Sequence, residues 1–184
     1  LVVNDRRKFT DYQILASRIA EEERAFTREF AAIKQRSRSL NEIDRTRLIR
    51  ILDFLEDELD DASEFADLTL ERYATDRSFR RSLERWIEKL VNASIDIAKI
   101  ILASERRAIP QTYRETLEHL PTVAAFKPST ALCEKLAGNT QVRNMLAHEY
   151  LDLRFSRISA VARDAEPTYR ALVAAVRKWM TDVN

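Results

Sequence analysis

The sequence predicts an all-α protein, an up-and-down bundle of four to five helices with an extra N-terminal helix. Its 184 residues include one glycine and four prolines, whereas β-hairpins need glycine at turn positions with positive φ. Charged residues make up 33% of the chain and apolar residues 45%. They are arranged in long Ala/Leu/Ile/Arg/Glu stretches that are typical of amphipathic helices.

The first predicted helix covers about residues 10–35 and begins with a capping box at Thr10. Its apolar positions form a less regular stripe than those of the later helices. The polar segment 36–41 that follows indicates a linker. We therefore expect two parts, a helical extension over residues 1–40 and a helical bundle over residues 41–184.

The second and third helices show the clearest periodicity. The second is predicted over about residues 42–72, after an N-cap at Asn41. Its apolar residues follow the 3-4 spacing of a buried face: Leu48, Ile51, Leu52, Leu55, Leu59, Ala62 and Ala66. The third, about residues 77–104, follows an N-cap at Asp76. It is the most apolar segment, so we expect it at the centre of the bundle.

Prolines mark the boundaries of the remaining helices. A short helix at about 112–120 lies between two prolines. A last helical region at about 156–182 is expected to be interrupted or to restart near Pro167. The fourth long helix is predicted over about 130–150 with Ser129 as its N-cap. Its middle contains the single glycine, a position at which a kink is expected.

Charge and cysteine content restrict the setting. The formal net charge is +1, so no global positive field marks a nucleic-acid binder. Cys133 is the only cysteine, which excludes an internal disulfide and favours a reducing, cytoplasmic location. No apolar run approaches the ~18 residues of a membrane span, so no membrane association is expected.

Several other residues have ordinary structural interpretations. We expect His119 to be a surface or capping residue, Cys133 to be a small core residue, and the two tryptophans to be core or dimer anchors. One basic cluster could line an RNA path, but a solvated helix face is the favoured interpretation: Arg77, Arg80, Arg81 and Arg85.

The segment 143–150 holds the residues with the clearest chemical potential. His148 is one of only two histidines, and its imidazole could take a proton from a ribose 2′-OH or give one to a leaving 5′-oxygen. The Arg143 guanidinium could hold the phosphate. Asn144 could orient the imidazole, and Tyr150 could bind phosphate or stack on a base. Metal-free RNA cleavage of this kind needs no metal ion and no cofactor.

The spacing of these residues bears on assembly. Arg143 and His148 are five residues apart, so they diverge by about 140° on a straight helix. Either the helix unwinds near His148, or two copies meet across a two-fold axis and combine their side chains. We favour the second arrangement, which predicts a homodimer. In the structural alternative, Arg143 pairs with a carboxylate, His148 complements a helix end and Tyr150 packs against a neighbouring helix.

The complete pattern R-N-x-x-x-H-x-Y, from Arg143 to Tyr150, resembles the HEPN superfamily and in particular its HepT-like toxins. Two other segments support this resemblance. Residues 93–98, Ala-Ser-Ile-Asp-Ile-Ala, are similar to the "ashDIA"-like signature of the family, and residues 110–115 resemble its Pro-x-x-Tyr-Arg-Glu turn. The resemblance covers about residues 42–182.

The resemblance implies a HEPN-like bundle whose homodimer forms a composite active site. HepT-like proteins are metal-independent RNA endonucleases encoded beside a minimal nucleotidyltransferase antitoxin, which silences them by transferring AMP to the motif tyrosine. Carried onto this chain, Arg143 and His148 are the catalytic pair and Tyr150 is the site of AMPylation. Asn144 is a supporting residue, and Asp96 of the central helix is expected near the pair.

Two alternatives remain beside this interpretation. The chain could be a non-catalytic HEPN-fold protein that serves as binding partner or substrate of a nucleotidyltransferase, or a helical interaction module with an accidental motif. The intact Arg143–His148 pair favours the enzyme, because a scaffold has no physical need for it. One departure is the segment 151–154, Leu-Asp-Leu-Arg, where the family usually continues with aromatic or acidic residues.

Overall fold

The computed structural model describes four stretches of the chain: residues 16–28, 40–142, 145 and 151–182. The chain divides into two compact units, Leu1–Ser39 and Leu40–Asn184. In the first unit, residues 16–28 are helical, and Ile19 and Phe26 are exposed. The remainder of the predicted first helix, with its capping box, lies outside the described residues.

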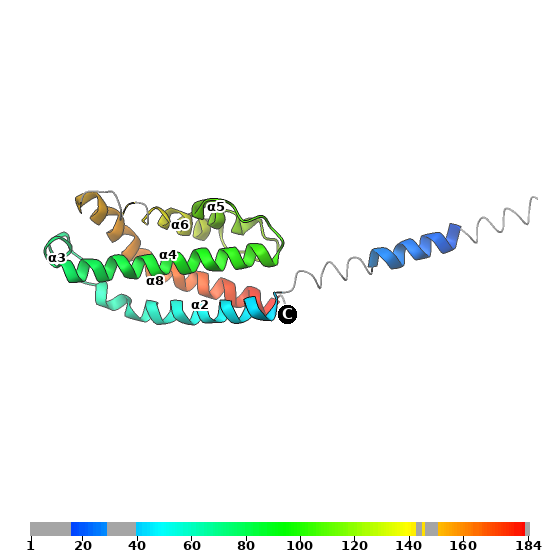
Figure 1. The fold of residues 1–184 in the computed structure, drawn as a ribbon, viewed down its shortest axis with the longest axis horizontal. Helices are drawn as coiled ribbons and strands as arrows, with labels where there is room; N and C mark the ends of the chain where they lie inside the picture. The colour runs from blue at the N-terminus through cyan, green and yellow to red at the C-terminus, as the bar shows by residue number, and fades with distance from the viewer. Residues whose placement is uncertain (1–15, 29–39, 143–144, 146–150, 183–184) are drawn as a thin grey trace, which may run out of the picture. The chain divides into compact units, whose positions relative to one another are not determined.

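The second unit is a helical bundle. Its three long helices are α2 (Glu42–Asp60), α4 (Arg77–Ser104) and α8 (Leu151–Asp182), which pack against one another (Figure 1). Shorter elements complete it: η1 (Asp61–Phe65), α3 (Leu70–Thr75), α5 (Tyr113–Glu118), η2 (Leu120–Thr122) and α6 (Thr130–Asn139). Every described element is helical, so the predicted all-α class is confirmed.

Local sequence signals set the starts of three helices as predicted. Asn41 Oδ1 accepts a hydrogen bond from the Asp44 N–H at 2.8 Å, at the start of α2. Asp76 Oδ1 accepts from two N–H groups in the first turn of α4, at 3.0 and 2.9 Å. Ser129 Oγ accepts from the Leu132 N–H at 3.1 Å and caps α6. Each cap satisfies backbone donors that a helix start leaves without partners.

The predicted single helix over 42–72 was wrong, because the chain breaks it into α2, η1 and α3. Phe65 turns into the core and packs on two aromatic rings of α4, with centroids 5.9 Å from Phe79 and 4.9 Å from Trp86. Thr69 then caps α3 by accepting a hydrogen bond from the Arg72 N–H. The apolar period continues through this region, but tertiary packing of Phe65 and the Thr69 cap change the backbone path.

The expected interruption near Pro167 was also wrong, since α8 is one helix that begins five residues earlier than predicted and includes this proline. A helical proline removes one hydrogen bond, here the one to the carbonyl of residue 163. Pro167 is exposed, so water can reach this part of the helix. The buried residues Tyr169, Leu172 and Val176 hold the helix against the core on its other side.

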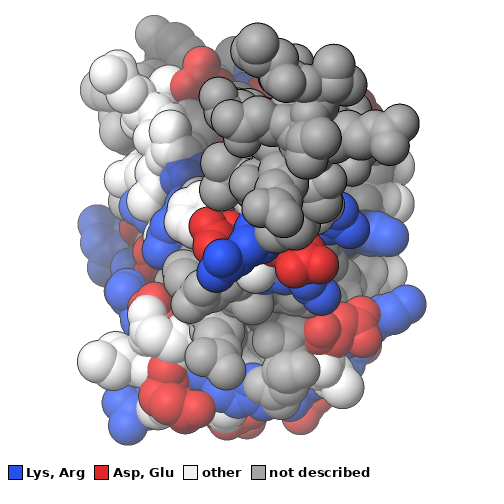
Figure 2. Space-filling view, turned by 90° about the vertical axis from the view of Figure 1, so that its right-hand side faces the viewer, with Lys and Arg blue, Asp and Glu red and all other residues white. Residues whose placement is uncertain are grey.

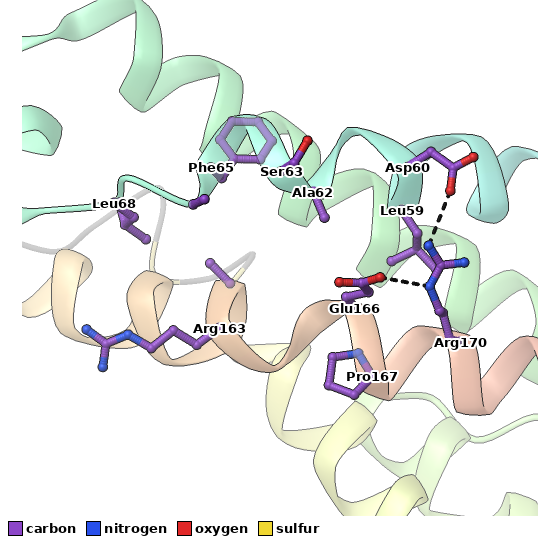
Figure 3. Close-up of a pocket in the computed structure, with 12 residues that line it drawn as sticks. Leu59, Asp60, Ala62, Ser63, Phe65, Leu68, Arg163, Glu166, Pro167 and Arg170 are labelled. Atoms are coloured by element: carbon purple, nitrogen blue, oxygen red, sulfur yellow. Dashed lines mark hydrogen bonds and ion pairs between the residues drawn. The ribbon is translucent and has the colours of Figure 1, made fainter.

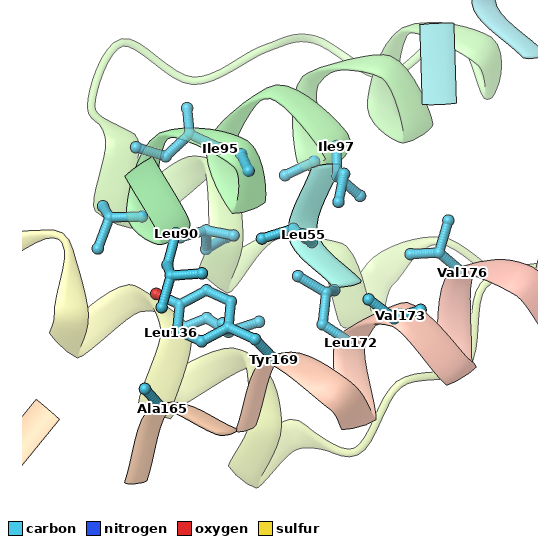
Figure 4. Close-up of a cluster of buried hydrophobic side chains, with 14 of the residues drawn as sticks. Leu55, Leu90, Ile95, Ile97, Leu136, Ala165, Tyr169, Leu172, Val173 and Val176 are labelled. Atoms are coloured by element: carbon cyan, nitrogen blue, oxygen red, sulfur yellow. The ribbon is translucent and has the colours of Figure 1, made fainter. Parts of the chain in front are cut away.

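The core surrounds α4, as predicted for the most apolar segment. Figure 4 shows Tyr169 of α8 beside Leu90 of α4 and Leu136 of α6, and all three side chains are fully buried. Both tryptophans are buried core residues. The Trp86 Nε1–H donates to the Glu58 carbonyl at 2.7 Å, which joins α4 to α2. Burial of these side chains is the main force that holds the bundle together.

None of the helices in the described stretches is long and apolar enough to cross a lipid bilayer.

Candidate functional site

The four motif residues predicted to carry the chemistry lie outside the described residues: Arg143, Asn144, His148 and Tyr150. The structure does describe both flanks of this segment, α6 before it and α8 after it. It also describes Met145 within the segment, whose side chain is buried. The flanks therefore show where the chain enters and leaves the motif segment.

The N-terminal flank is anchored in the core. After α6 ends at Asn139, Thr140 caps the helix end, and its hydroxyl donates to the Ala137 carbonyl at 2.7 Å. Val142 and Met145 are both buried. Because buried apolar side chains are costly to expose, they secure the chain on both sides of Arg143 and Asn144.

A buried polar group lies beside this flank. The Tyr169 hydroxyl of α8 is fully buried and faces the side chains of Asn139 in α6 and Ser94 in α4. Burial raises the pKa of this phenol well above its usual value, an effect that the two neighbouring polar side chains partly offset. Tyr169 therefore stays neutral where α4, α6 and α8 meet, beside the last residue of α6.

The C-terminal flank is held by a cluster from three helices that we call the α3–α4–α8 cluster: Tyr73, Glu84, Arg154 and Phe155. The Tyr73 hydroxyl donates to Glu84 Oε1 at 2.5 Å, and Arg154 Nη1 lies 3.4 Å from the same oxygen. The Tyr73 and Phe155 rings are 5.4 Å apart. Burial and the adjacent carboxylate raise the pKa of Tyr73, so its hydroxyl remains a donor.

Sequence reasoning missed this cluster. Arg154 and Glu84 are 70 residues apart, and nothing in the local pattern of either residue indicates the pairing. The ion pair is only about one-fifth exposed at both side chains. It fixes the start of α8, which follows the motif segment in the sequence, to α4.

Asp96, predicted as a supporting residue, is described by the structure. It is half-buried in α4 and lines a groove of about 410 Å³ between α2 and α4. The other described residues that form this groove come from the same two helices: Arg47, Arg50, Ile51, Phe54, Lys89, Asn92 and Ala93. Asp96 is therefore beside a basic surface, while its expected proximity to Arg143 and His148 stays a prediction.

A second cavity, of about 530 Å³, lies between the α2–η1 corner and α8 (Figure 3). Arg170 at its edge pairs with two carboxylates, at 3.2 Å from Asp60 and 3.0 Å from Glu166. Figure 3 shows both acids directed to this guanidinium. Two carboxylates, Asp60 and Glu166, and two guanidiniums, Arg163 and Arg170, line this cavity, so it carries no net positive charge to attract an anionic substrate.

The arginine cluster at the start of α4 fits a structural and solvated role. Arg80 donates to the carbonyls of Tyr73 and Ala74 at 2.9 and 3.2 Å, and Arg85 pairs with Glu88. Figure 2 views the other end of the bundle, the right-hand side of Figure 1, and shows basic and acidic side chains intermixed among the described residues visible there. His119 is exposed and caps α5, with Nδ1 2.8 Å from the Glu115 carbonyl.

Most of the helical bundle matches a known protein family. A family model described as "Ribonuclease HepT-like" matches residues 55–176, a stretch that runs from α2 through the motif segment and into α8. A comparison with curated proteins gave no match.

Proposed function

Because the chain belongs to the HepT-like ribonuclease family, we propose that it is a metal-independent RNA endonuclease that acts as the toxin of a toxin–antitoxin module. The family is named for ribonuclease activity. The observation that carries the finer proposal is the pattern from Arg143 to Tyr150. It combines a proton-transfer group with a phosphate ligand, and the matched region includes it.

The proposed reaction uses the ribose of the substrate as the nucleophile. The imidazole of His148 accepts the proton of the 2′-OH, the 2′-oxygen attacks phosphorus, and the bond to the 5′-oxygen breaks. A protonated imidazole gives a proton to the leaving 5′-oxygen, so the products are a 2′,3′-cyclic phosphate and a 5′-hydroxyl. Arg143 stabilises the charge that builds on the phosphate oxygens, and Asn144 orients the imidazole.

A homodimer fits this chemistry. Two copies of the motif in one cleft supply two imidazoles, of which one can act as base and the other as acid. The angular divergence of Arg143 and His148 on a straight helix supports the same arrangement, because the arginine of one copy can then serve the histidine of the other.

Control by a cognate nucleotidyltransferase is part of the proposal. Tyr150 is two residues after His148, so an AMP group on its hydroxyl would add bulk and negative charge close to the catalytic imidazole. Such a group would repel the phosphates of RNA. The antitoxin would thus silence the enzyme without unfolding it.

The decisive test is cleavage of RNA by the purified full chain in EDTA. Wild type is compared with His148→Ala and with His119→Ala, which removes the other histidine from an exposed helix cap. We expect wild type and His119→Ala to cut RNA and leave 2′,3′-cyclic or 3′-phosphate ends. We expect His148→Ala to lose at least about 100-fold in rate, as for loss of a general base.

Equal cleavage by His148→Ala and wild type would remove the catalytic assignment. Absence of cleavage by all three proteins would favour a non-catalytic partner of a nucleotidyltransferase, provided that intact mass shows Tyr150 free of AMP.

A further inference from the structure

The groove between α2 and α4 combines three features that together fit a nucleotide. It is about 410 Å³ in volume, within the range of small-ligand sites. Three basic side chains line it, Arg47, Arg50 and Lys89, together with the Phe54 ring. Asn92 and Asp96 supply polar groups on the α4 wall.

The arginines of α2 that line the groove have no carboxylate partner among the described residues, whereas the acidic residues on another face of α2 are paired. There, the acidic residues face α8 and are paired: Arg177 contacts Glu56 at 2.7 Å and Asp53 at 3.4 Å. Arg47 and Arg50 are centred about 120° from this acidic face around the helix, by their spacing. Both are exposed, and neither makes an ion pair or hydrogen bond within the described stretches. Two unneutralised guanidiniums one turn apart are suited to bind a phosphate.

Lys89, unlike the two arginines, is paired with a carboxylate. Its ammonium is 2.7 Å from Glu58 Oε1, and that carboxylate is largely buried. The pair fixes the wall between α2 and α4 and leaves the anion-binding role to Arg47 and Arg50.

Phe54 supplies the aromatic surface. Its side chain is 40% exposed and lies on the same face of α2 as the two arginines, four and seven residues further along the helix. An aromatic ring beside guanidiniums is the combination by which single-stranded nucleic acids are bound, since the base stacks on the ring while the cations hold the phosphate.

We propose that the α2–α4 groove binds one nucleotide unit of a single-stranded RNA, with the base against Phe54 and the phosphate on Arg47 and Arg50. The identity of the ligand as RNA rests on the proposed ribonuclease function, whereas the groove chemistry stands on the residues above. The bound nucleotide belongs to the same strand as the bond that is cut but is not part of that bond. In this position the edge of its base lies beside Asn92 and Asp96.

The test measures binding apart from cleavage. The probe is a fluorescein-labelled 2′-O-methyl RNA of about ten nucleotides, which lacks the 2′-OH needed for cleavage, and anisotropy is recorded at several salt concentrations with the full chain. The variants are the double Arg47→Ala/Arg50→Ala and the single Phe54→Leu. The matched control is Arg163→Ala/Lys178→Ala, which removes two exposed cations from α8. Circular dichroism confirms that all four proteins are folded.

We expect the groove double variant to bind at least about tenfold more weakly, with a salt slope smaller by about 1.4 because two phosphate contacts are lost at about 0.7 each. Phe54→Leu should weaken binding by about fivefold or more with the slope unchanged, since stacking carries no charge. The α8 control should stay within about twofold of wild type.

Three results would overturn the groove assignment: no binding of the probe by wild type, equal weakening in the α8 control, or wild-type affinity of the groove variants. A separate cleavage assay on unmodified RNA distinguishes this failure from failure of the proposed function. If RNA is cleaved equally by wild type and the groove variants, the groove assignment is wrong and the proposed nuclease function stands. If binding depends on the groove but no RNA is cleaved, the groove assignment stands and the proposed nuclease function is wrong.

Discussion

Burial decides the chemistry of the one cysteine. Cys133 is buried in α6, and burial, with a smaller contribution from Glu134, raises the pKa of its thiol to about 11. The thiolate is the reactive form. We expect iodoacetamide to alkylate the native protein at pH 8 at least about tenfold more slowly than free glutathione, as measured by intact mass over time.

The same protein in denaturant should react at a rate close to that of glutathione, and the native rate should rise with pH toward 11, because only then does the thiolate form. Rapid native alkylation at pH 8 would show that Cys133 is accessible or ionised, contrary to its position in the core.

The proposed modification of Tyr150 gives a second residue-scale prediction. Wild type incubated with its cognate nucleotidyltransferase and ATP should gain the mass of one adenylyl group, with pyrophosphate as the leaving group, and Tyr150→Phe should gain none, because the acceptor hydroxyl is absent. Tyr113→Phe is the control, since Tyr113 is also exposed but lies outside the motif. A mass gain on Tyr150→Phe would identify another residue as the target.

At the scale of elements, the start of α4 depends on one side chain. The Asp76 carboxylate accepts from two backbone N–H groups and lies at the positive end of the helix dipole. Asp76→Ala should lower the free energy of unfolding by about 1 kcal/mol, as measured by urea denaturation. Asp76→Asn should retain most of the stability, because an amide oxygen also caps.

Asp57→Ala provides the matched control for this loss of a carboxylate, since Asp57 is exposed in the last turn of α2, away from any helix start. Its change should stay within about 0.5 kcal/mol. An equal loss in both variants would mean that the effect of Asp76 is one of net charge and not of capping.

The helix boundaries show which elements are set locally. Asn41, Asp76 and Ser129 begin their helices where the sequence indicates, because a cap needs only the residues of its own first turn. The corner after Asp60 is different. It exists because Phe65 packs on rings of α4, a contact with residues that are distant in the sequence. Continuity of α8 through Pro167 likewise depends on packing against the bundle.

At the scale of the whole molecule, we propose that the bundle folds without the extension. The contacts of Leu40–Asn184 form a unit separate from Leu1–Ser39, and the described core residues all belong to it. A chain starting at residue 40 should therefore unfold cooperatively, with a thermal midpoint within a few degrees of the full chain. Circular dichroism and calorimetry measure this. Loss of cooperative unfolding would show that the extension contributes to the core.

The sequence by itself determined the all-α class, the central place of α4, three helix starts and the family, and it supplied the motif from which the ribonuclease is proposed. These depend on composition, on short-range periodicity and on residues adjacent in the chain. Only the tertiary structure decided the corner at Phe65, the α3–α4–α8 cluster and the α2–α4 groove with Phe54 and Asp96. Each of these joins side chains from different helices, and such pairings arise when the helices bury their apolar faces against one another.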